Sequence, residues 1–187
     1  MAKQLLRKTM LSRRKQHSAG ELAEAGDRIQ LTLIASPEFR AAQVVALYAP
    51  IHGEVATDKV MAAALAAGKT VLFPAVCDDS LRFVAVADHG QLQPGAYGIP
   101  EPCPTEGVVP VECADLVVVP GVAFDLGGRR VGYGKGYYDR AVHHLEGQGR
   151  LVAFCYDFQL VAEIAGEPHD VAVDRIITET RIIRPLG

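Results

Sequence analysis

The sequence lacks any apolar run that approaches the roughly 20 residues a membrane-spanning helix needs. It also lacks a surplus of positive charge, because 19 lysines and arginines face 22 aspartates and glutamates and give a net charge of −3. No positive field over the whole molecule would therefore attract nucleic acid. The amino terminus is basic but has neither the apolar core nor the cleavage site of a signal peptide. We therefore expect a cytoplasmic protein that binds neither membrane nor nucleic acid.

Cysteine is scarce and widely spaced. No two of the four cysteines are separated as in CxxC, so neither a zinc site nor a redox dithiol is indicated. Free, mostly buried thiols are the simplest interpretation. The residues are Cys77, Cys103, Cys113 and Cys155.

The composition is that of an ordinary globular protein. Hydrophobic residues make up 49% of the 187 positions and charged residues 22%, which excludes disordered and collagen-like chains and coiled coils. Domains usually have roughly 100–200 residues, so we expect residues 1–187 to form one domain.

The first segment is a basic amphipathic helix. Apolar Leu6, Met10 and Leu11 lie within a turn of one another at helical spacing. Six basic residues and no acid precede Glu21: Lys3, Arg7, Lys8, Arg13, Arg14 and Lys15. Lys3 and Arg7 share one helix face and could clamp a polyphosphate, whereas a charge run of this kind is more often a solvated face. We assign Lys8, Arg13, Arg14 and Lys15 to such a face.

Two short patterns then mark helix starts. Ser18-Ala19-Gly20-Glu21 has the form of a capping box, so a second helix begins there and ends before Pro37. Ser36 is typical of an N-cap, and Pro37 of the first turn of the short helix that follows.

From Val44 onward the pattern alternates between strands and helices. Such alternation predicts an α/β fold with a mostly parallel sheet flanked by helices on both faces. Ligands in these folds bind beyond the carboxyl ends of the strands, here after Tyr48, Val119 and Cys155. The predicted strands are Val44–Tyr48, Thr70–Phe73, Leu116–Val119, Leu151–Cys155 and Ile176–Thr178, with Leu81–Val86 as a half-exposed antiparallel partner; the predicted helices are one capped by Thr57 that runs through Ala67, and Tyr137–Leu145. Residues 88–112 are rich in Pro and Gly, which is typical of a loop or of a segment at the edge of the sheet, and no feature in this segment indicates a chemical function.

The residue pattern of Pro120–Arg140 is too unusual for a segment with only a structural role. Six glycines lie within sixteen of its residues, and three of them alternate around Lys135 just before a helix. Exposed backbone N–H groups at a helix start form an anion site, to which Lys135 and Arg130 add positive charge suited to phosphate. Asp139, in the first helical turn, could hold Mg²⁺. The segment matches neither the P-loop nor the dinucleotide-binding pattern. Without a ligand role, the glycines would form a tight turn between strand and helix, and Asp139 would be an acid favoured by the dipole at the start of a helix.

These residues resemble a known signature. Pro120–Arg140 is similar to the signature of the 5-formyltetrahydrofolate cyclo-ligase family, also called 5,10-methenyltetrahydrofolate synthetases. The resemblance extends over nearly the whole chain, through the basic first helix, Tyr48-Ala49-Pro50 with Glu54, and His169-Asp170. It implies an ATP-dependent ring closure in which ATP phosphorylates the formyl oxygen of 5-formyltetrahydrofolate and the neighbouring nitrogen then displaces phosphate. It also implies a fold similar to ribose-5-phosphate isomerase and CoA-transferase domains.

The resemblance carries roles onto individual residues. Lys135 and Arg130 take the catalytic positions. ATP-binding positions fall on Lys3, Arg7, Arg130, Val131, Gly132, Tyr133, Gly134, Lys135, Gly136, Tyr137 and Tyr138. Substrate-binding positions fall on Ala49, Glu54, Tyr133, Gly134, Lys135, Gly136 and Tyr137. The Mg²⁺ positions fall on Asp139 and Asp170, with Asp174 as a neighbouring alternative.

Other interpretations stay open at this point. Glu54 without the resemblance would be a surface acid, Tyr133 either stacks on a planar ligand or packs, and His169 is more typical of a structural or solvent-facing residue. A degenerate relative that binds RNA through its basic helix, and a sugar-phosphate isomerase or CoA-transferase on a similar sheet, are the competing functions. We expect a monomer.

Overall fold

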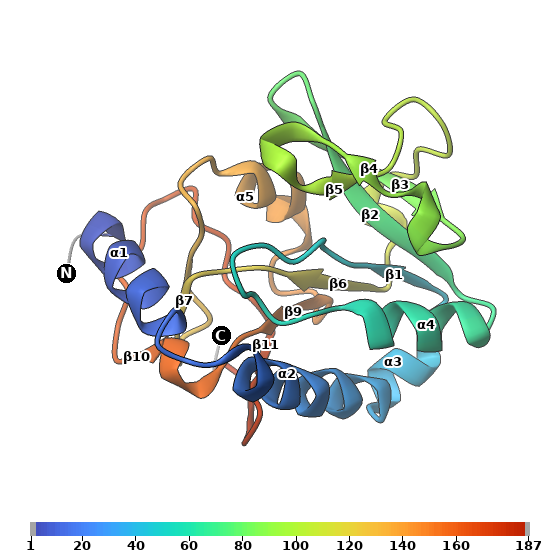
Figure 1. The fold of residues 1–187 in the computed structure, drawn as a ribbon. Coiled ribbons are helices and arrows are strands. Elements are labelled where there is room, and N and C mark those ends of the chain that lie inside the picture. Colours follow the sequence, from blue (N-terminus) through green and yellow to red (C-terminus); the bar gives the residue numbers. More distant parts are fainter. Residues whose placement is uncertain (1–2, 186–187) are drawn as a thin grey trace.

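The computed structural model describes residues 3–185, whose helices and strands form three layers (Figure 1). The helices are α1 Lys3–Arg14, α2 Ala19–Ile34, α3 Pro37–Ala41, α4 Asp58–Ala66 and α5 Tyr137–Val142. The strands are β1 Val44–Ala46, β2 Thr70–Cys77, β3 Ser80–Val86, β4 Gln93–Pro94, β5 Pro100–Glu101, β6 Leu116–Val119, β7 Ala123–Asp125, β8 Arg130–Val131, β9 Leu151–Phe154, β10 Leu160–Val161, β11 Arg175–Ile177 and β12 Ile182–Ile183. No helix among these residues is both long and apolar enough to cross a membrane.

A seven-stranded sheet forms the middle layer, in the order β12-β11-β9-β6-β1-β2-β3. The neighbours from β11 to β2 pair in parallel, and the two outer pairs, β11–β12 and β2–β3, are antiparallel. The predicted α/β class with a mostly parallel sheet is therefore confirmed, as is the antiparallel strand at Leu81–Val86. A second, smaller sheet of β10-β7-β8 lies against α1.

Both faces of the large sheet are buried, as expected of parallel strands covered by helices. On β6, Leu116 and Val118 belong to the apolar cluster that α2, α3 and α4 cover. Val117 and Val119 point the other way, into the cluster under α5. Figure 1 shows α2, α3 and α4 together below the sheet and α5 above it. This alternation along each strand fixes which face each helix covers.

Helix starts follow the predicted caps in two of three places. Ser18 and Glu21 form the full capping box of α2, and the Ser36 hydroxyl accepts from Phe39 N–H at the start of α3. Thr57 does not cap α4 as predicted, because its hydroxyl donates to the Tyr48 carbonyl at 2.8 Å. The buried side chain of Gln30 on α2 accepts from Lys59 and Val60 N–H instead.

Several predicted bounds and one burial prediction need correction. The strand predicted to reach Tyr48 ends at Ala46, and the helix predicted to reach Leu145 turns into a 3₁₀ turn, His143–Leu145. The cysteines of the described chain are free as expected, but only Cys155 is buried, whereas Cys77 is half-buried and Cys103 and Cys113 are exposed. The excursion at 88–112 contains the β4–β5 hairpin.

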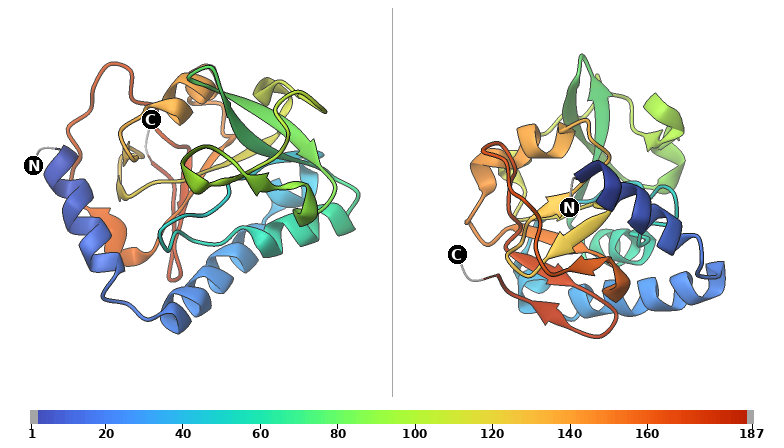
Figure 2. Two further views of the ribbon diagram at one scale, coloured as in Figure 1. Left: turned by 45° about the horizontal axis from the view of Figure 1, so that its top comes forward. Right: turned by 90° about the vertical axis from the view of Figure 1, so that its left-hand side faces the viewer.

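Helix α1 lies across the end of the molecule where the chain leaves β6 and enters β7 (Figures 1 and 2). Its buried Leu6 and Met10 pack with Ala123 and Val131 of the small sheet and with Val122 just before it. The basic helix is therefore anchored over the carboxyl end of β6, at the edge where ligands bind in such folds.

Candidate active site

The glycine-rich loop 132–136 leaves β8 and leads directly into α5, as the sequence predicts. Gly134 and Gly136 have φ angles of +99° and +66°, a conformation that other residues rarely adopt. A side chain at Gly134 would also meet the guanidinium of Arg7, whose Nη2 lies 3.4 Å from the position of the added Cβ. The glycines thus allow the backbone to turn beneath an arginine, which a simple strand-to-helix turn would not require.

Two cations of the predicted nucleotide site lie at this loop. Arg7 Nε donates to the Gly132 carbonyl at 2.7 Å, so α1 and the loop are held together. Lys135 is exposed, and its Nζ lies 5.5 Å from the centre of the Tyr97 ring. The loop therefore presents one exposed lysine beside an arginine from another element.

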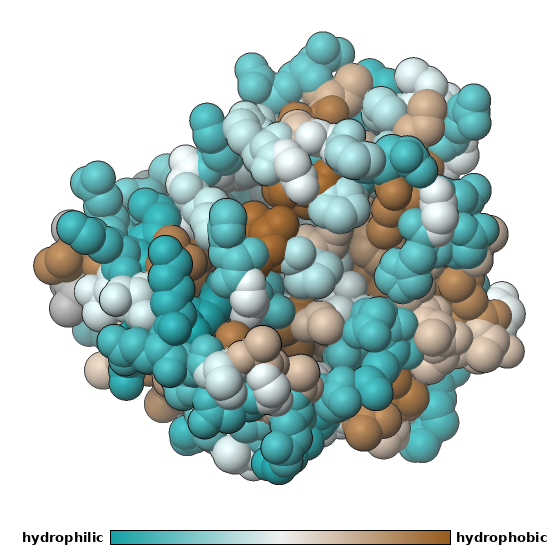
Figure 3. Space-filling model, in the orientation of Figure 1, coloured by the Kyte–Doolittle hydropathy of each residue, from teal (hydrophilic) through white to brown (hydrophobic). Residues whose placement is uncertain are grey.

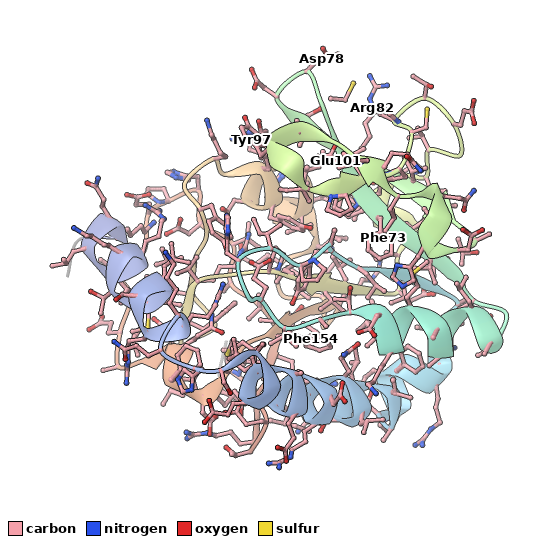
Figure 4. The ribbon with its side chains drawn as sticks, in the orientation of Figure 1. Phe73, Asp78, Arg82, Tyr97, Glu101 and Phe154 are labelled. Atoms are coloured by element: carbon pink, nitrogen blue, oxygen red, sulfur yellow. The ribbon has the colours of Figure 1, made fainter. Side chains whose placement is uncertain are left out.

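Tyr97 lies in residues 88–112, the segment in which the sequence indicates no chemical function. Figure 4 places it on the side of the β4–β5 region nearest α5. Its hydroxyl lies 3.3 Å from that of Tyr137, and this bond raises the pKa of Tyr137 to about 12. No local pattern marks Tyr97, because only the fold brings residues 40 positions apart into contact. The face of Figure 3 is hollowed between this region and α1, with hydrophobic residues at the bottom of the hollow and hydrophilic residues around it.

Arg130 is a buried residue, 5% exposed, rather than a free phosphate ligand in this arrangement. Its Nη2 donates to Asp139 Oδ1 at 2.9 Å and its Nη1 to the Val171 carbonyl at 3.2 Å. Burial lowers the pKa of Arg130, and the charge of Asp139 opposes that change. Arg130 therefore holds Asp139 in place.

The segments that carry the two predicted Mg²⁺ carboxylates meet, although 31 positions separate Asp139 from Asp170. Asp139 Oδ1 accepts from the N–H of Val171, the residue after Asp170. Both oxygens of Asp170 accept from Lys3 Nζ, at 2.8 and 2.6 Å, and Glu167 N–H donates to Oδ2. Carboxylate oxygens suit Mg²⁺, so the donor set fits that ion, with Lys3 now bound to one of the two acids.

The alternative acid, Asp174, lies at the other end of the strands. Its carboxylate accepts from Leu151 N–H at 2.8 Å, where β9 begins. The structure thus separates Asp174 from Asp139 and places Asp170 beside it. His169 is 73% exposed, which confirms the expected solvent-facing position.

Glu54, a predicted substrate residue, is buried rather than a surface acid. A tight turn through His52 and Gly53, both with positive φ, folds it back so that Oε2 accepts from Ile51 N–H at 3.0 Å. Burial raises the pKa of Glu54 to about 7, while the Ile51 N–H, Arg14 and Tyr133 hold it down. Ala49 is also buried, at the start of the same loop. Such an acid, inside the protein and partly ionised near neutral pH, is typical of functional sites.

Arg14, which we predicted to be a solvated surface charge, is buried at 2% exposure. It falls on the same face of α1 as Leu6 and Met10, because the three residues are spaced by four. This spacing was the sequence signal for its burial. Its Nη1 donates to the hydroxyl of Tyr133, whose half-buried ring packs against the small apolar cluster and whose pKa burial raises to about 12.

The remaining predicted loop residues divide by burial. Val131 is buried in the small sheet, and Gly132 contributes its carbonyl to Arg7. Tyr138 is half-buried between the two main apolar clusters, and burial raises its pKa. The loop backbone and Lys135, rather than these side chains, face the exposed side.

An α/β sheet with a glycine loop, an exposed lysine and two aspartates from segments that meet beyond its strand ends has the form of an enzyme that handles a phosphorylated ligand. The model of the 5-formyltetrahydrofolate cyclo-ligase family matches residues 1–179. The chain belongs to this family and is an enzyme of it.

Known proteins support this assignment. A 5-formyltetrahydrofolate cyclo-ligase of Mycolicibacterium smegmatis is 33% identical over 74% of this chain and 75% of its own. That of Escherichia coli is 27% identical over 91% and 96%. The solved 5,10-methenyltetrahydrofolate synthetase of Aquifex aeolicus superposes with a TM-score of 0.87 at 36% identity, over 100% of this chain and 94% of its own. That of Mycoplasma pneumoniae superposes with a TM-score of 0.78 at 26% identity, over 96% and 99%.

Proposed function

We propose that this protein converts 5-formyltetrahydrofolate to 5,10-methenyltetrahydrofolate and releases ADP and phosphate in an ATP- and Mg²⁺-dependent reaction. Family membership supports the cyclo-ligase activity. The observation that carries the phosphate chemistry is the loop 132–136, with exposed Lys135 at its tip and Arg7 against Gly134. Backbone N–H groups at a helix start together with two cations suit a polyphosphate.

The reaction requires two displacements. The formyl oxygen attacks the terminal phosphorus of ATP and the bond to ADP breaks, giving a phosphorylated formyl group. The anilinic nitrogen next to the formyl group then attacks its carbon, the carbon–oxygen bond breaks, and phosphate leaves with the former formyl oxygen. The nitrogen loses its proton and the methenyl bridge is complete. This sequence needs no covalent protein nucleophile.

Each candidate residue has a physical role in this scheme. Lys135 stabilises the negative charge that builds on the transferred phosphoryl group. Asp139 and Asp170 would hold Mg²⁺, which neutralises phosphate charge when bound. Arg130 orients Asp139 from behind, as its 2.9 Å bond to that carboxylate indicates. Lys3 and Arg7, both on α1, would bind the phosphates of ATP.

Glu54 is proposed as the acceptor for the pterin ring, whose amide N–H and exocyclic amino group are donors. Its Oε1 is buried and has no hydrogen-bond partner within the described part of the chain. A buried acceptor without a partner is costly, and a ligand N–H would satisfy it.

The competing RNA-binding interpretation loses support, because three of the six basic residues that would form its RNA-binding face are bonded or buried within the protein. Lys3 is paired with Asp170, Arg7 is bonded to Gly132, and Arg14 is buried. These contacts point into the protein.

The test is a direct assay. Purified protein is mixed with 5-formyltetrahydrofolate, Mg²⁺ and ATP, and the methenyl absorbance in the near ultraviolet is followed. We expect an increase that requires both ATP and Mg²⁺. Turnover without ATP, or none with it, would overturn the proposal.

A further inference from the structure

Arg14 connects three loops that lie at the carboxyl ends of different strands. Its Nη1 donates to the His52 carbonyl, in the loop after β1, and to the Tyr133 hydroxyl, in the glycine-rich loop, both at 3.3 Å. Its Nη2 donates to the Gly121 carbonyl, in the loop after β6, at 3.2 Å. One buried guanidinium therefore fixes the relative positions of the segments that carry the proposed substrate residues Glu54 and Tyr133.

The backbone at Gly53 leaves room for the side chain of Arg14. Gly53 has a φ of +76°, and a Cβ added there would lie 3.3 Å from Arg14 Cδ. The residue before Glu54 must thus be small because the arginine stem lies against it. This close approach brings the guanidinium charge to the turn that folds Glu54 inward.

Glu54 and Arg14 are both buried and both keep one polar atom without a partner in the described chain, Oε1 and Nε respectively. The charge of Arg14 favours the ionised form of Glu54, which burial disfavours. A pterin accepted through two N–H donors needs that ionised form.

We propose that Arg14 is a positioning residue for folate: through its bonds to His52, Tyr133 and Gly121 it holds the Glu54 and Tyr133 loops together and so orients the Glu54 carboxylate. This inference rests on the proposed function, in which Glu54 accepts the pterin. The guanidinium of Arg14 donates only to protein groups, in the loops of His52, Tyr133 and Gly121, so its loss should act on folate affinity and not on nucleotide affinity.

The tyrosines around Glu54 do not change charge between pH 6 and 9. Burial raises the pKa of Tyr48 well above its usual value and that of Tyr156 to about 12. Tyr133 and Tyr138 are shifted in the same direction by the same cause. His52, whose exposed ring lies 5.8 Å from that of Tyr133, is the group that needs a control.

The central experiment measures KM for 5-formyltetrahydrofolate and for ATP from pH 6 to 9 in the wild type and in Arg14→Met. Without the guanidinium the ionised form of Glu54 is less favourable, so the midpoint of the folate KM profile should move to higher pH. At pH 7 the folate KM should rise about tenfold or more, fall back toward the wild type at pH 9, and leave the ATP KM within about twofold. A purely structural role would raise KM at every pH alike.

Arg13→Met is the matched control, since Arg13 is exposed and reaches only the Phe158 carbonyl, at 3.4 Å. It should keep the wild-type profile. His52→Asn should keep the wild-type midpoint, and a lost midpoint in that variant would assign the titration to His52 and overturn the inference. Arg14→Lys keeps the positive charge but loses the planar set of guanidinium donors. It should therefore keep the pH midpoint of the folate KM profile but raise the folate KM.

The outcomes separate this inference from the proposed function. If Glu54→Gln leaves folate KM unchanged, Glu54 does not accept the pterin and the proposed substrate contact fails. If Glu54→Gln raises KM while Arg14→Met leaves KM and its midpoint unchanged, only the role of Arg14 fails. Should Arg14→Met not fold, Arg14→Lys and Tyr133→Phe decide: an unchanged folate KM in both would overturn the inference.

Discussion

Lys135 and Arg130 carry the same charge in the same signature, yet the fold gives them opposite positions. Arg130 is 5% exposed and held by Asp139 and Val171. Lys135 is exposed, between two glycines, with its ammonium above the Tyr97 ring. Under the proposed function, Lys135 is therefore the cation that meets an incoming phosphate, whereas Arg130 orders Asp139 beside it.

Replacing Lys135 with alanine tests that division. We expect kcat to fall by about 100-fold or more, because a donor to the transition-state charge is lost. The circular dichroism spectrum and Tm should stay close to those of the wild type, because the side chain is exposed. Lys8→Ala, an exposed lysine on α1, is the control. A Lys135→Ala enzyme with wild-type kcat would exclude the phosphate role.

Glu54 makes a separate prediction about stability. Its pKa is about 7 in the folded protein and about 4.5 in the unfolded chain, so the folded state binds more protons between these values. The free energy of unfolding should therefore fall as pH rises from 4.5 to 7, by up to about 3 kcal/mol. Glu54→Gln should lack this component. Urea unfolding of both proteins at pH 5 and pH 8 measures it, and an equal pH dependence would contradict the burial of this acid.

At the scale of elements, local patterns predicted helix starts only where the cap is local. The capping box of Ser18 and Glu21 and the Ser36 cap involve neighbours in sequence, and both are confirmed. The cap of α4 comes from Gln30, on another helix, and a sequence alone does not bring these residues together. Arg14 shows the same limit, because its helical face predicts burial but not which loops it contacts.

Gln30 offers a test at this scale. Its side chain accepts from Lys59 and Val60 N–H at 2.8 and 3.3 Å, and removing it leaves these donors without a partner. Gln30→Ala should cost about 1–3 kcal/mol in the free energy of unfolding. The exposed Gln16→Ala should cost little, within about 0.5 kcal/mol. Equal urea midpoints for the two variants would show that α4 does not depend on this cap.

At the scale of the molecule, alternating strands and helices were enough to predict the class of fold. The buried runs at 116–119 and 151–154 carry their own signal, because strands covered on both faces are continuously apolar. The small β10-β7-β8 sheet and Tyr97 were not predictable, since two- and three-residue strands and a contact across 40 positions leave no periodicity.

The strand order also bears on the number of domains. β1 lies between β2 and β6, and β9 and β11 continue the same sheet from the other half of the chain. We propose that residues 1–187 form one cooperative domain. Thermal unfolding followed by circular dichroism and by tyrosine fluorescence should give a single, coincident transition. Two separated transitions would argue for independent parts.

The most direct test of the central claim follows one oxygen atom. If ATP phosphorylates the formyl oxygen, that atom must leave with the phosphate. Substrate labelled with oxygen-18 in the formyl group is converted under single-turnover conditions, and the phosphate released is examined by mass spectrometry. The account predicts that each phosphate carries one labelled oxygen. Unlabelled phosphate, with the label in water, would contradict it.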